Sequence, residues 1–404
     1  MRRYGLLGEK LGHSFSPQIH AMLGSYDYQL YELRPDELPG FMRDNPLSGF
    51  NVTIPYKQAV MPYLQGLSPA AQSIGAVNTV IRQPDGNLYG DNTDAYGFEC
   101  QLGEAEALRG RKALILGSGG ASKTVQWVLA SKGIQGIVIS RQGEDNYNNL
   151  SRHQDAALIV NTTPVGMSPK VEASPLDLQG FEHLKLVLDL IYNPARTRLM
   201  LQAQDLGLVC RGGLSMLAAQ AIRASWLFGQ IPPGSADLDS VIQALDRRTR
   251  NIALIGMPGC GKSSVARALA RLSGRPVFDT DQMLSESTGL SPAEIIQTHG
   301  EPAFRRMESQ MLSEAGQQTG AIIATGGGVV TQQGNLNALR QNSRILWLKR
   351  PLHLLPTGNR PISQAEGLEA LYQKRAPLYG SWSERSYDHQ NIEKTARQIM
   401  EDWL

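Results

Sequence analysis

A glycine-rich loop in the second half of the chain has the residue spacing of a phosphate-binding site. Residues 256–263 read GMPGCGKS and fit the pattern G-x-x-x-x-G-K-S/T. An apolar run at 252–255 precedes the loop and a helix-like run at 263–272 follows it, which is the context that this pattern requires. Glycine N–H groups can surround phosphate oxygens, a lysine can neutralise the terminal phosphates, and a serine hydroxyl can bind Mg²⁺. The residues available for this chemistry are Gly259, Gly261, Lys262, Ser263 and Ser264.

Two carboxylates follow this loop in the sequence. The stretch 277–281 reads VFDTD, which predicts a second strand ending in Asp279 and Asp281. On a parallel sheet this strand would end at the same edge as the phosphate loop, so a carboxylate there can reach a metal ion or an acceptor hydroxyl. The alternative is a polar strand end that caps the next helix.

A second glycine turn lies earlier in the chain. The apolar run 114–116 leads directly into GSGGAS at 117–122, and a helix-like stretch begins near Lys123. Such a unit can direct amide N–H groups at a pyrophosphate, although any α/β domain can contain a similar turn. After the next predicted strand, 137–139, the chain has Ser-Arg where an NAD-binding protein has Asp or Glu. The guanidinium of Arg141 suits a 2′-phosphate, so NADP is the expected dinucleotide.

Polar residues near the N-terminus have the types that bind a small carboxylate. Ser16 and Pro17 are predicted as the N-cap and the first residue of a helix, and Ser14 adds a second hydroxyl beside them. A helix N-terminus can receive a carboxylate, and the alternative is a capped helix without a ligand. Lys57 ends an apolar strand, and Asp94 lies in a turn-like cluster. A single lysine is usually a solvated surface charge, so these residues alone leave its role open.

The composition is that of a globular protein with several domains. The chain has 404 residues, a formal net charge of +2, 41% hydrophobic and 19% charged residues. Such a balance gives no basic field for nucleic acid or a membrane surface. The three cysteines are far apart and lack metal-ligand spacing, which favours a reducing compartment. Without a signal-like N-terminus or an apolar run of membrane-spanning length, we expect a cytoplasmic protein that acts on small molecules. Self-association into a homo-oligomer is compatible with this sequence.

Short apolar runs alternate with longer amphipathic stretches, which predicts βαβ units around mostly parallel sheets. A Pro- and Gly-containing stretch, 231–237, and a charged run, 246–250, mark the main boundary. We expect a substrate-binding α/β domain, a Rossmann domain for NADP, a linker and a P-loop α/β domain with a parallel sheet. Their predicted ranges are 1–100 completed by helices at 213–245, then 101–212, 246–250 and 251–404.

Several further segments of the first part are GHSFSP at 12–17, NVTIPYK at 51–57, GAVNT at 75–79, NTD at 92–94, NTTPVGM at 161–167, DLIYNP at 189–194 and GLSMLAAQ at 213–220. In their order and spacing, over roughly residues 1–245, they resemble the shikimate dehydrogenase family. The resemblance implies the reversible, NADPH-dependent reduction of 3-dehydroshikimate to shikimate. It also implies that two hydroxyls hold the substrate carboxylate, three polar side chains hold the ring substituents, and a Lys–Asp pair meets the reacting oxygen. By position these are Ser14 and Ser16, then Thr53, Asn78 and Gln220, then Lys57 and Asp94.

The same resemblance assigns the dinucleotide to the first glycine turn. By position the contacts would come from Gly117, Gly119, Gly120, Ala121 and Arg141. The chemistry agrees with a Lys–Asp pair, because negative charge grows on the ketone oxygen as hydride arrives, and a positioned ammonium can stabilise and protonate it. The family usually has a further basic residue near the arginine, whereas this chain has Ser140-Arg141-Gln142. We therefore expect weak discrimination against NAD.

The second part resembles the shikimate kinase family over about residues 250–404. The resemblance is carried by the phosphate loop, GEPAFRRME at 300–308, TGGG at 325–328 and KRAPLY at 374–379. It implies a nucleoside-monophosphate-kinase-like fold and the ATP- and Mg²⁺-dependent phosphorylation of shikimate. Asp281 would orient or deprotonate the attacking hydroxyl, Asp279 would support Mg²⁺ bound by Ser263, and Lys262 would act on the phosphates. The shikimate contacts would come from Asp281, Arg305, Gly327, Gly328 and Arg375.

One departure from the kinase family lies between Trp347 and Pro361. This segment is a few residues shorter than the usual lid; Arg360 matches the later lid arginine that would contact the nucleotide, while Arg350 sits too early to be assigned. A shorter lid predicts weaker ATP affinity or some hydrolysis of ATP without shikimate. Two alternatives therefore stay open. The second part could be an ATP-binding regulatory domain of weak or lost kinase activity, and the first could act on quinate or a related polyol.

Overall fold

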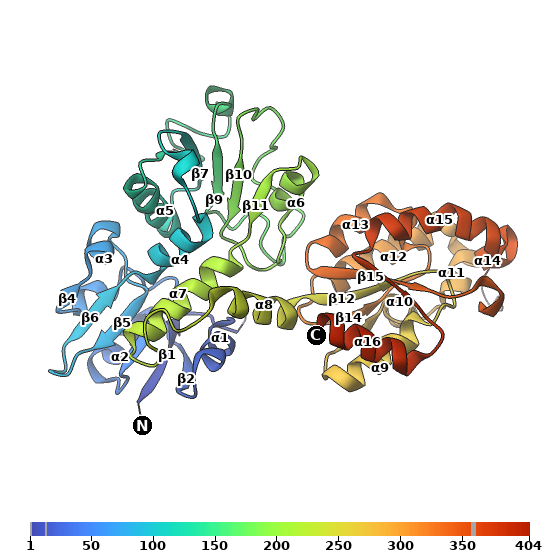
Figure 1. Cartoon of the computed structure of the whole chain (residues 1–404), viewed down its shortest axis with the longest axis horizontal. Helices are drawn as coiled ribbons and strands as arrows, with labels where there is room; N and C mark the ends of the chain where they lie inside the picture. The colour runs from blue at the N-terminus through green and yellow to red at the C-terminus, as the bar shows by residue number, and fades with distance from the viewer. Residues whose placement is uncertain (1, 13, 357–360) are drawn as a thin grey trace. The chain divides into compact units, whose positions relative to one another are not determined.

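The computed structural model describes residues 2–12, 14–356 and 361–404 (Figure 1). These residues form two compact units. The first unit comprises Met1–Gly166, Ala173–Tyr192 and Gln202–Leu245, and the second comprises Met167–Glu172, Asn193–Leu201 and Asp246–Leu404.

The N-terminal part of the first unit is built on a mixed six-stranded sheet of order β2-β1-β3-β5-β6-β4. Strands β1, β2 and β3 run parallel, and β5 pairs antiparallel with both β3 and β6. The strands are β1 Arg3–Gly8, β2 Asp27–Glu32, β3 Gly49–Val52, β4 Gly66–Leu67, β5 Thr79–Arg82 and β6 Leu88–Asp91. The helices in this part are α1 Ser16–Leu23, α2 Leu38–Asp44 and α3 Pro69–Ile74.

The second sheet of this unit is five-stranded and fully parallel, with the order β11-β10-β9-β7-β8. Its strands are β7 Lys112–Leu116, β8 Gln135–Ile139, β9 Leu158–Asn161, β10 Leu186–Asp189 and β11 Val209–Arg211. Residues 113–116 of β7 are fully buried, as expected for a central parallel strand covered on both faces. The remaining helices before the second unit's sheet are α4 Thr93–Leu102, α5 Gly120–Ser131, α6 Arg198–Asp205, α7 Leu214–Leu227 and α8 Leu238–Thr249.

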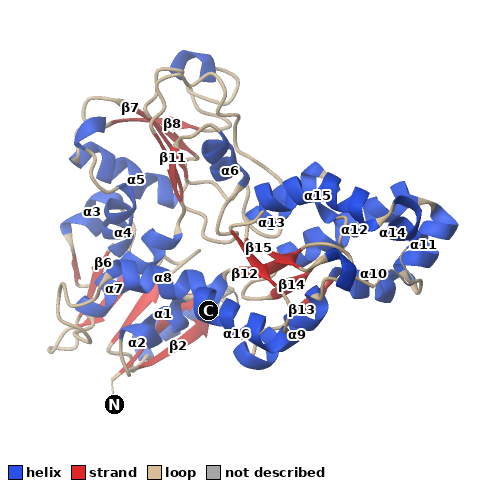
Figure 2. Ribbon diagram, turned by 45° about the vertical axis from the view of Figure 1, so that its right-hand side comes forward, coloured by secondary structure: helices blue, strands red, loops and turns tan. Residues whose placement is uncertain are grey.

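The second unit contains a parallel sheet of order β13-β14-β12-β15-β16. Helices α9 and α16 lie on one side of it, and α12, α13 and α15 lie on the other (Figure 1; strands are red in Figure 2). The strands are β12 Asn251–Ile255, β13 Val277–Asp279, β14 Ile322–Ala324, β15 Ser343–Lys349 and β16 Arg385–Asp388. The helices are α9 Lys262–Ser273, α10 Thr280–Thr288, α11 Pro292–His299, α12 Glu301–Gly316, α13 Gln333–Arg340, α14 Pro361–Glu366, α15 Leu368–Trp382 and α16 Ile392–Trp403.

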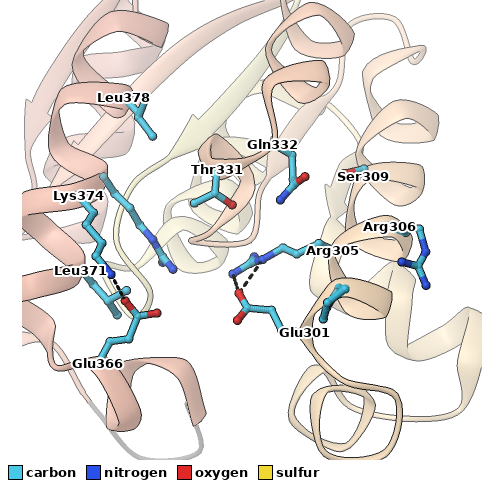
Figure 3. Close-up of a pocket in the computed structure, with 12 residues that line it drawn as sticks. Glu301, Arg305, Arg306, Ser309, Thr331, Gln332, Glu366, Leu371, Lys374 and Leu378 are labelled. Atoms are coloured by element: carbon cyan, nitrogen blue, oxygen red, sulfur yellow. Dashed lines mark hydrogen bonds and ion pairs between the residues drawn. The ribbon is translucent and has the colours of Figure 1, made fainter.

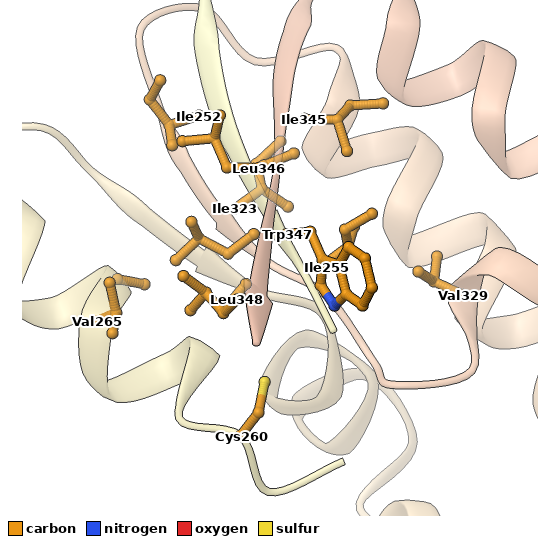
Figure 4. Packing of buried hydrophobic residues seen from close by; sticks show 14 of the residues in the cluster. Ile252, Ile255, Cys260, Val265, Ile323, Val329, Ile345, Leu346, Trp347 and Leu348 are labelled. Carbon is orange, nitrogen blue, oxygen red and sulfur yellow. The ribbon is translucent and has the colours of Figure 1, made fainter. Parts of the chain in front are cut away.

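An apolar cluster fixes the end of β12 and the loop that follows it. Ile252 and Ile255 of β12 pack with Ile323 of β14 and with Leu346 of β15 (Figure 4). Cys260, in the glycine-rich loop, belongs to the same buried cluster. The loop therefore leaves the sheet from a rigid base, which is the support that a binding loop needs. The expected α/β fold class, with parallel sheets in the Rossmann and P-loop parts, is confirmed.

The charged run 246–250, predicted as a linker, is largely helical. Residues up to Thr249 continue helix α8, and strand β12 begins at Asn251. The helix extends this far because Val241 and Leu245 are buried in an apolar cluster with residues of α1 and α7. Among the described residues, no helix is long and apolar enough to cross a bilayer.

Candidate functional sites

A cavity of about 450 Å³ in the first unit gathers residues from separate parts of the chain. Its walls include the ends of β1 and β3 and residues of α4, α5 and α7. Every residue assigned by the sequence to the dehydrogenase substrate lines it: Ser14, Ser16, Thr53, Lys57, Asn78, Asp94 and Gln220. The cavity also includes Lys10, Asn51 and Tyr192, which were not assigned as site residues.

Two hydroxyls lie together at one end of this cavity. The Ser14 hydroxyl donates to Ser16 Oγ at 3.2 Å and accepts from the Ser16 N–H at 3.2 Å. The predicted N-cap role of Ser16 is wrong: Ser16 is the first residue of α1, and Phe15 precedes it without a side-chain capping bond. The reason is that Phe15 already has helical backbone angles, so the helix starts earlier than Pro17 suggests. Both hydroxyls are thereby left facing the cavity.

Lys57 and Asp94 form the charged pair of the cavity. Lys57 follows β3 in a turn, whereas Asp94 lies in the first turn of α4, whose N-cap is Asn92. The Lys57 Nζ donates to Asp94 Oδ2 at 2.6 Å. Both side chains are partly buried and both line the cavity, so a carboxylate holds the ammonium group at the cavity wall.

Amide and hydroxyl groups form a connected wall beside this pair. Asn78 Oδ1 accepts from the Thr93 N–H at 2.6 Å and from the Thr93 hydroxyl at 3.1 Å. The Thr93 hydroxyl also lies 3.5 Å from Gln220 Oε1 on α7. On β3, Asn51 Nδ2 donates to Thr79 Oγ1 at 3.0 Å. These bonds fix the orientation of the amides, so they present defined donors and acceptors to a polar ring.

A buried aromatic layer lies behind the wall, and sequence reasoning did not assign it. Tyr28 on β2 donates from its hydroxyl to Asn51 Oδ1 at 2.8 Å. The His20 ring stacks on Tyr28 with centroids 3.9 Å apart, and His20 Nδ1 lies 2.5 Å from the Tyr26 hydroxyl, which in turn contacts Ser225 Oγ at 2.6 Å. Burial, only partly offset by the amide of Asn51, lowers the pKa of His20 to about 3. The layer is therefore neutral at physiological pH.

The first glycine turn connects β7 to α5. Gly117 has a φ of +104°, which only glycine adopts readily, and Gly119 and Gly120 have open space where a Cβ would lie. Helix α5 begins at Gly120, earlier than the predicted start near Lys123, and its N-cap Gly119 makes no side-chain capping bond. Its N-terminal amides and the adjoining Ala121 are thus open to a phosphate group. Arg141 follows β8 and is exposed.

The phosphate loop of the second unit has the geometry its spacing predicts. Gly259 and Gly261 have φ values of +78° and +102°, and α9 begins at Lys262 without a side-chain cap. Lys262 is buried, and its Nζ donates to Gly256 O at 2.9 Å and to Met257 O at 3.1 Å. Ser263 and Ser264 lie in the first turn of α9, where the backbone N–H groups of the helix N-terminus favour an anion.

A cavity of about 590 Å³ lies between this loop and α12. It is lined by Pro258 of the loop and by all five predicted shikimate contacts, which are Asp281, Arg305, Gly327, Gly328 and Arg375. The glycines are needed for packing, because a Cβ at Gly327 would lie 2.6 Å from Pro258 Cδ and one at Gly328 would collide with the Arg305 guanidinium. Arg375 donates to Gly327 O at 3.2 Å.

Asp281 is displaced from its predicted position but stays at the site. It lies in the first turn of α10, because β13 ends at Asp279 and that residue caps the helix by accepting from the N–H groups of Asp281 and Gln282. Asp279 therefore caps α10, as the alternative predicted. Desolvation, together with the negative charges of Glu308 and Asp279, raises the pKa of Asp281 to about 6.

Arg305 is held by two carboxylates, neither of which sequence reasoning assigned. Its Nη1 donates to Glu308 Oε2 at 2.7 Å, and its Nη2 and Nε donate to Glu301 Oε1 at 2.9 and 3.2 Å. Figure 3 shows Arg305 and Glu301 facing a cavity of about 920 Å³ on the other side of the arginine. The spacings i, i+3 and i, i+4 on α12 could have revealed both pairs.

A further cavity of about 540 Å³ adjoins the first turns of α9. Ser264, Arg267, Arg350 and His389 line it, and a Cβ at Gly261 would lie 2.7 Å from His389 Nε2. Arg350 gives this cavity a cationic side chain, and its Nε is buried without a hydrogen-bond partner among the described residues. Arg360, the predicted lid arginine, lies outside the described residues. No group of three or more His, Cys, Asp or Glu side chains within the described ranges could hold a metal ion.

Comparisons with known proteins identify the first unit. Residues 6–80 match the family model of the shikimate dehydrogenase substrate binding domain. A shikimate dehydrogenase (NADP(+)) of Clostridium beijerinckii is 39% identical over 248 residues, which are 55% of this chain and 90% of the relative. The chain belongs to the shikimate dehydrogenase family. A second shikimate dehydrogenase (NADP(+)), from Oleidesulfovibrio alaskensis, is 41% identical over 244 residues, 54% of this chain and 86% of the relative.

Solved structures agree with this shikimate dehydrogenase assignment. A chorismate mutase/shikimate 5-dehydrogenase fusion protein from Clostridium acetobutylicum is 32% identical with a TM-score of 0.57, covering 61% of this chain and 97% of that one. The shikimate 5-dehydrogenase from Thermus thermophilus in complex with NADP(H) and shikimate is 34% identical with a TM-score of 0.54, covering 60% and 98%. Residues 258–403 match the shikimate kinase family model. The predicted fusion of the two families is confirmed.

Proposed function

We propose that this shikimate dehydrogenase family member is bifunctional: it reduces 3-dehydroshikimate to shikimate with NADPH and then phosphorylates shikimate with ATP. The first activity is supported chiefly by one observation, the Lys57–Asp94 pair in a cavity that also contains five more substrate-type residues. The second is supported by the cavity that joins Pro258 of the phosphate loop to Asp281 and two arginines.

In the dehydrogenase cavity, two pairs of side chains suit two groups of the substrate. Ser14 and Ser16 offer hydroxyl donors for a carboxylate, while Lys57, paired with Asp94, suits the reacting oxygen. Lys57 would stabilise the negative charge that grows on the ketone oxygen and give up a proton to it. Asn78 and Gln220 would hold the ring hydroxyls through amides already fixed by Thr93.

The first glycine turn fits a dinucleotide. The open positions at Gly119 and Gly120 let a pyrophosphate approach the N-terminal amides of α5, and Ala121 lines both this turn and the substrate cavity. NADPH would supply the hydride when bound there. Arg141 would bind the 2′-phosphate, and the absence of a second basic residue next to it in the sequence supports weak discrimination against NAD.

In the kinase cavity, Asp281 is suited to act as the base. A carboxyl group with a pKa of about 6 is ionised at pH 7 yet accepts a proton more readily than an ordinary aspartate. Arg305 and Arg375 would hold the substrate carboxylate, and Lys262 would leave its carbonyl partners for the transferred phosphate. The Ser263 hydroxyl would bind Mg²⁺, and Asp279 would support the ion. Both capping bonds of Asp279 use Oδ1, so its Oδ2 takes no part in capping the helix.

The cavity beside α9 would take the nucleoside end of ATP. Arg350 and His389 extend the site from the phosphate loop, and the Arg350 guanidinium would donate to a base or ribose oxygen. The rival function for the second unit is an ATP-binding regulatory domain. Asp281, Arg305 and Arg375 argue against it, because a module that only binds ATP has no need of an acceptor cavity.

One assay tests the whole proposal. The purified chain receives 3-dehydroshikimate, NADPH, ATP and Mg²⁺, and NADPH, ADP and shikimate 3-phosphate are followed together. We expect NADPH loss followed by ADP and phosphorylated product. NADPH loss without phosphorylated product would favour the regulatory rival, and the rate ratio between shikimate and quinate separates the two dehydrogenase substrates.

A further inference from the structure

Asn51 is a residue of the dehydrogenase cavity whose amide is held at both ends. It lies on β3, is 5% exposed and lines the cavity close to Thr53. Its Oδ1 accepts from the Tyr28 hydroxyl at 2.8 Å, and its Nδ2 donates to Thr79 Oγ1 at 3.0 Å and to Asn78 O at 3.4 Å. With a partner at each end, the amide cannot turn without breaking hydrogen bonds.

The hydrogen bonds continue from Asn51 to a predicted substrate contact. The Thr79 hydroxyl donates to Asn78 Oδ1 at 3.2 Å, and the same oxygen accepts from the Thr93 N–H at 2.6 Å. Because the oxygen of Asn78 is occupied, the amide offers its Nδ2 donors to a ligand in the cavity. Asn51 therefore helps to set which hydrogen-bonding group Asn78 presents to the substrate.

Tyr28 reaches Asn51 across one intervening strand. The strand order β2-β1-β3 places β1 between them, and the registers pair Tyr28 with Tyr4 and Asn51 with Leu6. Tyr4 and Leu6 alternate with Gly5 along β1, so the four paired side chains lie on one face of the sheet. The Tyr28 side chain therefore passes over β1 to meet the Asn51 amide.

Two features suit the Tyr28 hydroxyl to be a fixed donor. Burial, together with the neighbouring Tyr26, raises the pKa of Tyr28 well above its usual value, and the Ser16 side chain offsets only part of this rise. The hydroxyl is therefore protonated at physiological pH. The His20 ring stacks on the Tyr28 ring with centroids 3.9 Å apart. Since the stack does not use the hydroxyl, a phenylalanine would keep the ring in place and remove only the donor.

We propose that Tyr28 is a positioning residue of the dehydrogenase site: its hydroxyl fixes the Asn51 amide, and Asn51 in turn holds Asn78 in the orientation that meets the substrate. The inference rests on the proposed dehydrogenase function of this cavity. Tyr28 itself does not line the cavity, so its effect on a ligand must pass through a residue that does. The hydrogen bonds identify that residue as Asn51.

Tyr26 provides a matched control. It is partly buried like Tyr28 and belongs to the same aromatic layer, and its hydroxyl contacts His20 Nδ1 and Ser225 Oγ. Neither of these partners lines the cavity. Removing the hydroxyl of Tyr26 therefore costs the layer its hydrogen bonds without freeing the Asn51 amide.

The test compares the wild type, Tyr28→Phe and Tyr26→Phe as full chains in the oxidation of shikimate with NADP. We expect Tyr28→Phe to raise the KM for shikimate by about threefold to tenfold, the effect of one lost hydrogen bond. Its kcat should stay within about twofold of the wild type, because Lys57 and Asp94 are unchanged. Tyr26→Phe should leave both values unchanged. An unchanged KM in Tyr28→Phe, or an equal rise in both variants, overturns the inference.

A double-mutant cycle with Asn51→Ala tests the route of the effect. If Tyr28 acts through Asn51, Tyr28→Phe should change the KM for shikimate by less than about twofold once residue 51 is alanine. The same rise in KM in that background as in the wild type would mean that the hydroxyl acts by another route, and it overturns the inference.

Calorimetry with shikimate separates this inference from the proposed function. The second unit has the same sequence in all of these chains, so a difference between their isotherms comes from the first unit. Weaker binding to Tyr28→Phe than to Tyr26→Phe, without reduction of NADP by any chain, supports the positioning role and contradicts the dehydrogenase function. Reduction of NADP with equal KM values and equal isotherms supports the dehydrogenase function and overturns the positioning role. The absence of both NADP reduction and a difference in binding overturns both.

Discussion

Lys57 Nζ and Asp94 Oδ2 lie 2.6 Å apart, although the two residues come from different elements. Lys57 follows a strand and Asp94 begins a helix, so each is positioned by backbone that is already ordered. The carboxylate holds the Lys57 Nζ at the wall of the cavity, where a developing alkoxide would need a donor.

Replacing Lys57 should remove hydride transfer while keeping substrate binding. The Lys57→Ala variant lacks the group that stabilises and protonates the oxygen, and we expect kcat to fall by at least about 100-fold. Ser14, Ser16 and Gln220 remain, so the affinity for shikimate measured by calorimetry should change much less. NADPH oxidation at near wild-type rates would contradict the assignment.

The Gly328→Ala substitution should impair shikimate phosphorylation and leave the dehydrogenase activity unchanged. Its Cβ would collide with the Arg305 guanidinium, which cannot retreat because Glu308 holds it. Gly334→Ala is the control, since a Cβ at Gly334, in α13, meets open space. We expect Gly328→Ala to lose shikimate phosphorylation by at least about tenfold with normal dehydrogenase turnover, and Gly334→Ala to lose neither. Equal kinase activity in the two variants would show that the glycine is dispensable.

The sequence predicted best where function and local structure use the same residues. The phosphate loop, the glycine turn at Gly117 and most assigned residues of the dehydrogenase cavity lie near strand ends or helix starts, and short patterns reveal such positions. Gln220, inside α7, is the exception among the assigned cavity residues. Parallel sheets then bring those ends together. Lys57 and Asp94, in contrast, were paired only through the resemblance to the shikimate dehydrogenase family, because their own positions in the sequence left the role of Lys57 open.

The features that were not predicted from the sequence depend on contacts between residues that no local sequence pattern reveals. The Ser225 hydroxyl lies far along the chain from Tyr26 and His20, which it contacts, so only the folded chain shows the aromatic layer. Asp281 was placed one element too early, because the carboxylate of Asp279 caps a helix that starts immediately. The occupation of Arg305 by Glu301 depends on side-chain choices that a resemblance does not specify.

His20 should make the first unit sensitive to acid. Its pKa is about 3 in the folded protein and 6.5 when unfolded, so stability is full above pH 6.5 and falls as the pH drops toward 3. The slope approaches about 1.4 kcal/mol per pH unit for one proton. The His20→Asn variant should be less stable than the wild type at pH 8, but it should lose less stability between pH 8 and pH 5. The stability of the first unit can be measured at pH 8 and pH 5 by urea titration, with pulse proteolysis and mass spectrometry of peptides from that unit. An equal loss of stability in the wild type and in His20→Asn would contradict the prediction.

Asp281 should control the kinase activity and also destabilise the second unit at neutral pH. Its folded pKa of about 6 means that the base form is lost as the pH falls through 6, so phosphorylation should fall there as well. Asp281→Asn should phosphorylate shikimate slowly, and its rate should not fall in the same way as the pH drops through 6. Any pH dependence that remains in this variant reports the ionisation of ATP itself and serves as the baseline.

The stability effect of Asp281 has the opposite direction. A carboxyl whose pKa is raised from 3.8 stabilises the fold fully only below pH 3.8, and that contribution is lost as the pH rises through about 6. Asp281→Asn should therefore raise the melting temperature of the second unit at pH 7 and lose this advantage at pH 4. Differential scanning calorimetry at both pH values checks the difference. A variant with lower stability at pH 7 would mean that the Asp281 carboxylate is held by favourable contacts, and its role as a base with a raised pKa would fall with that result.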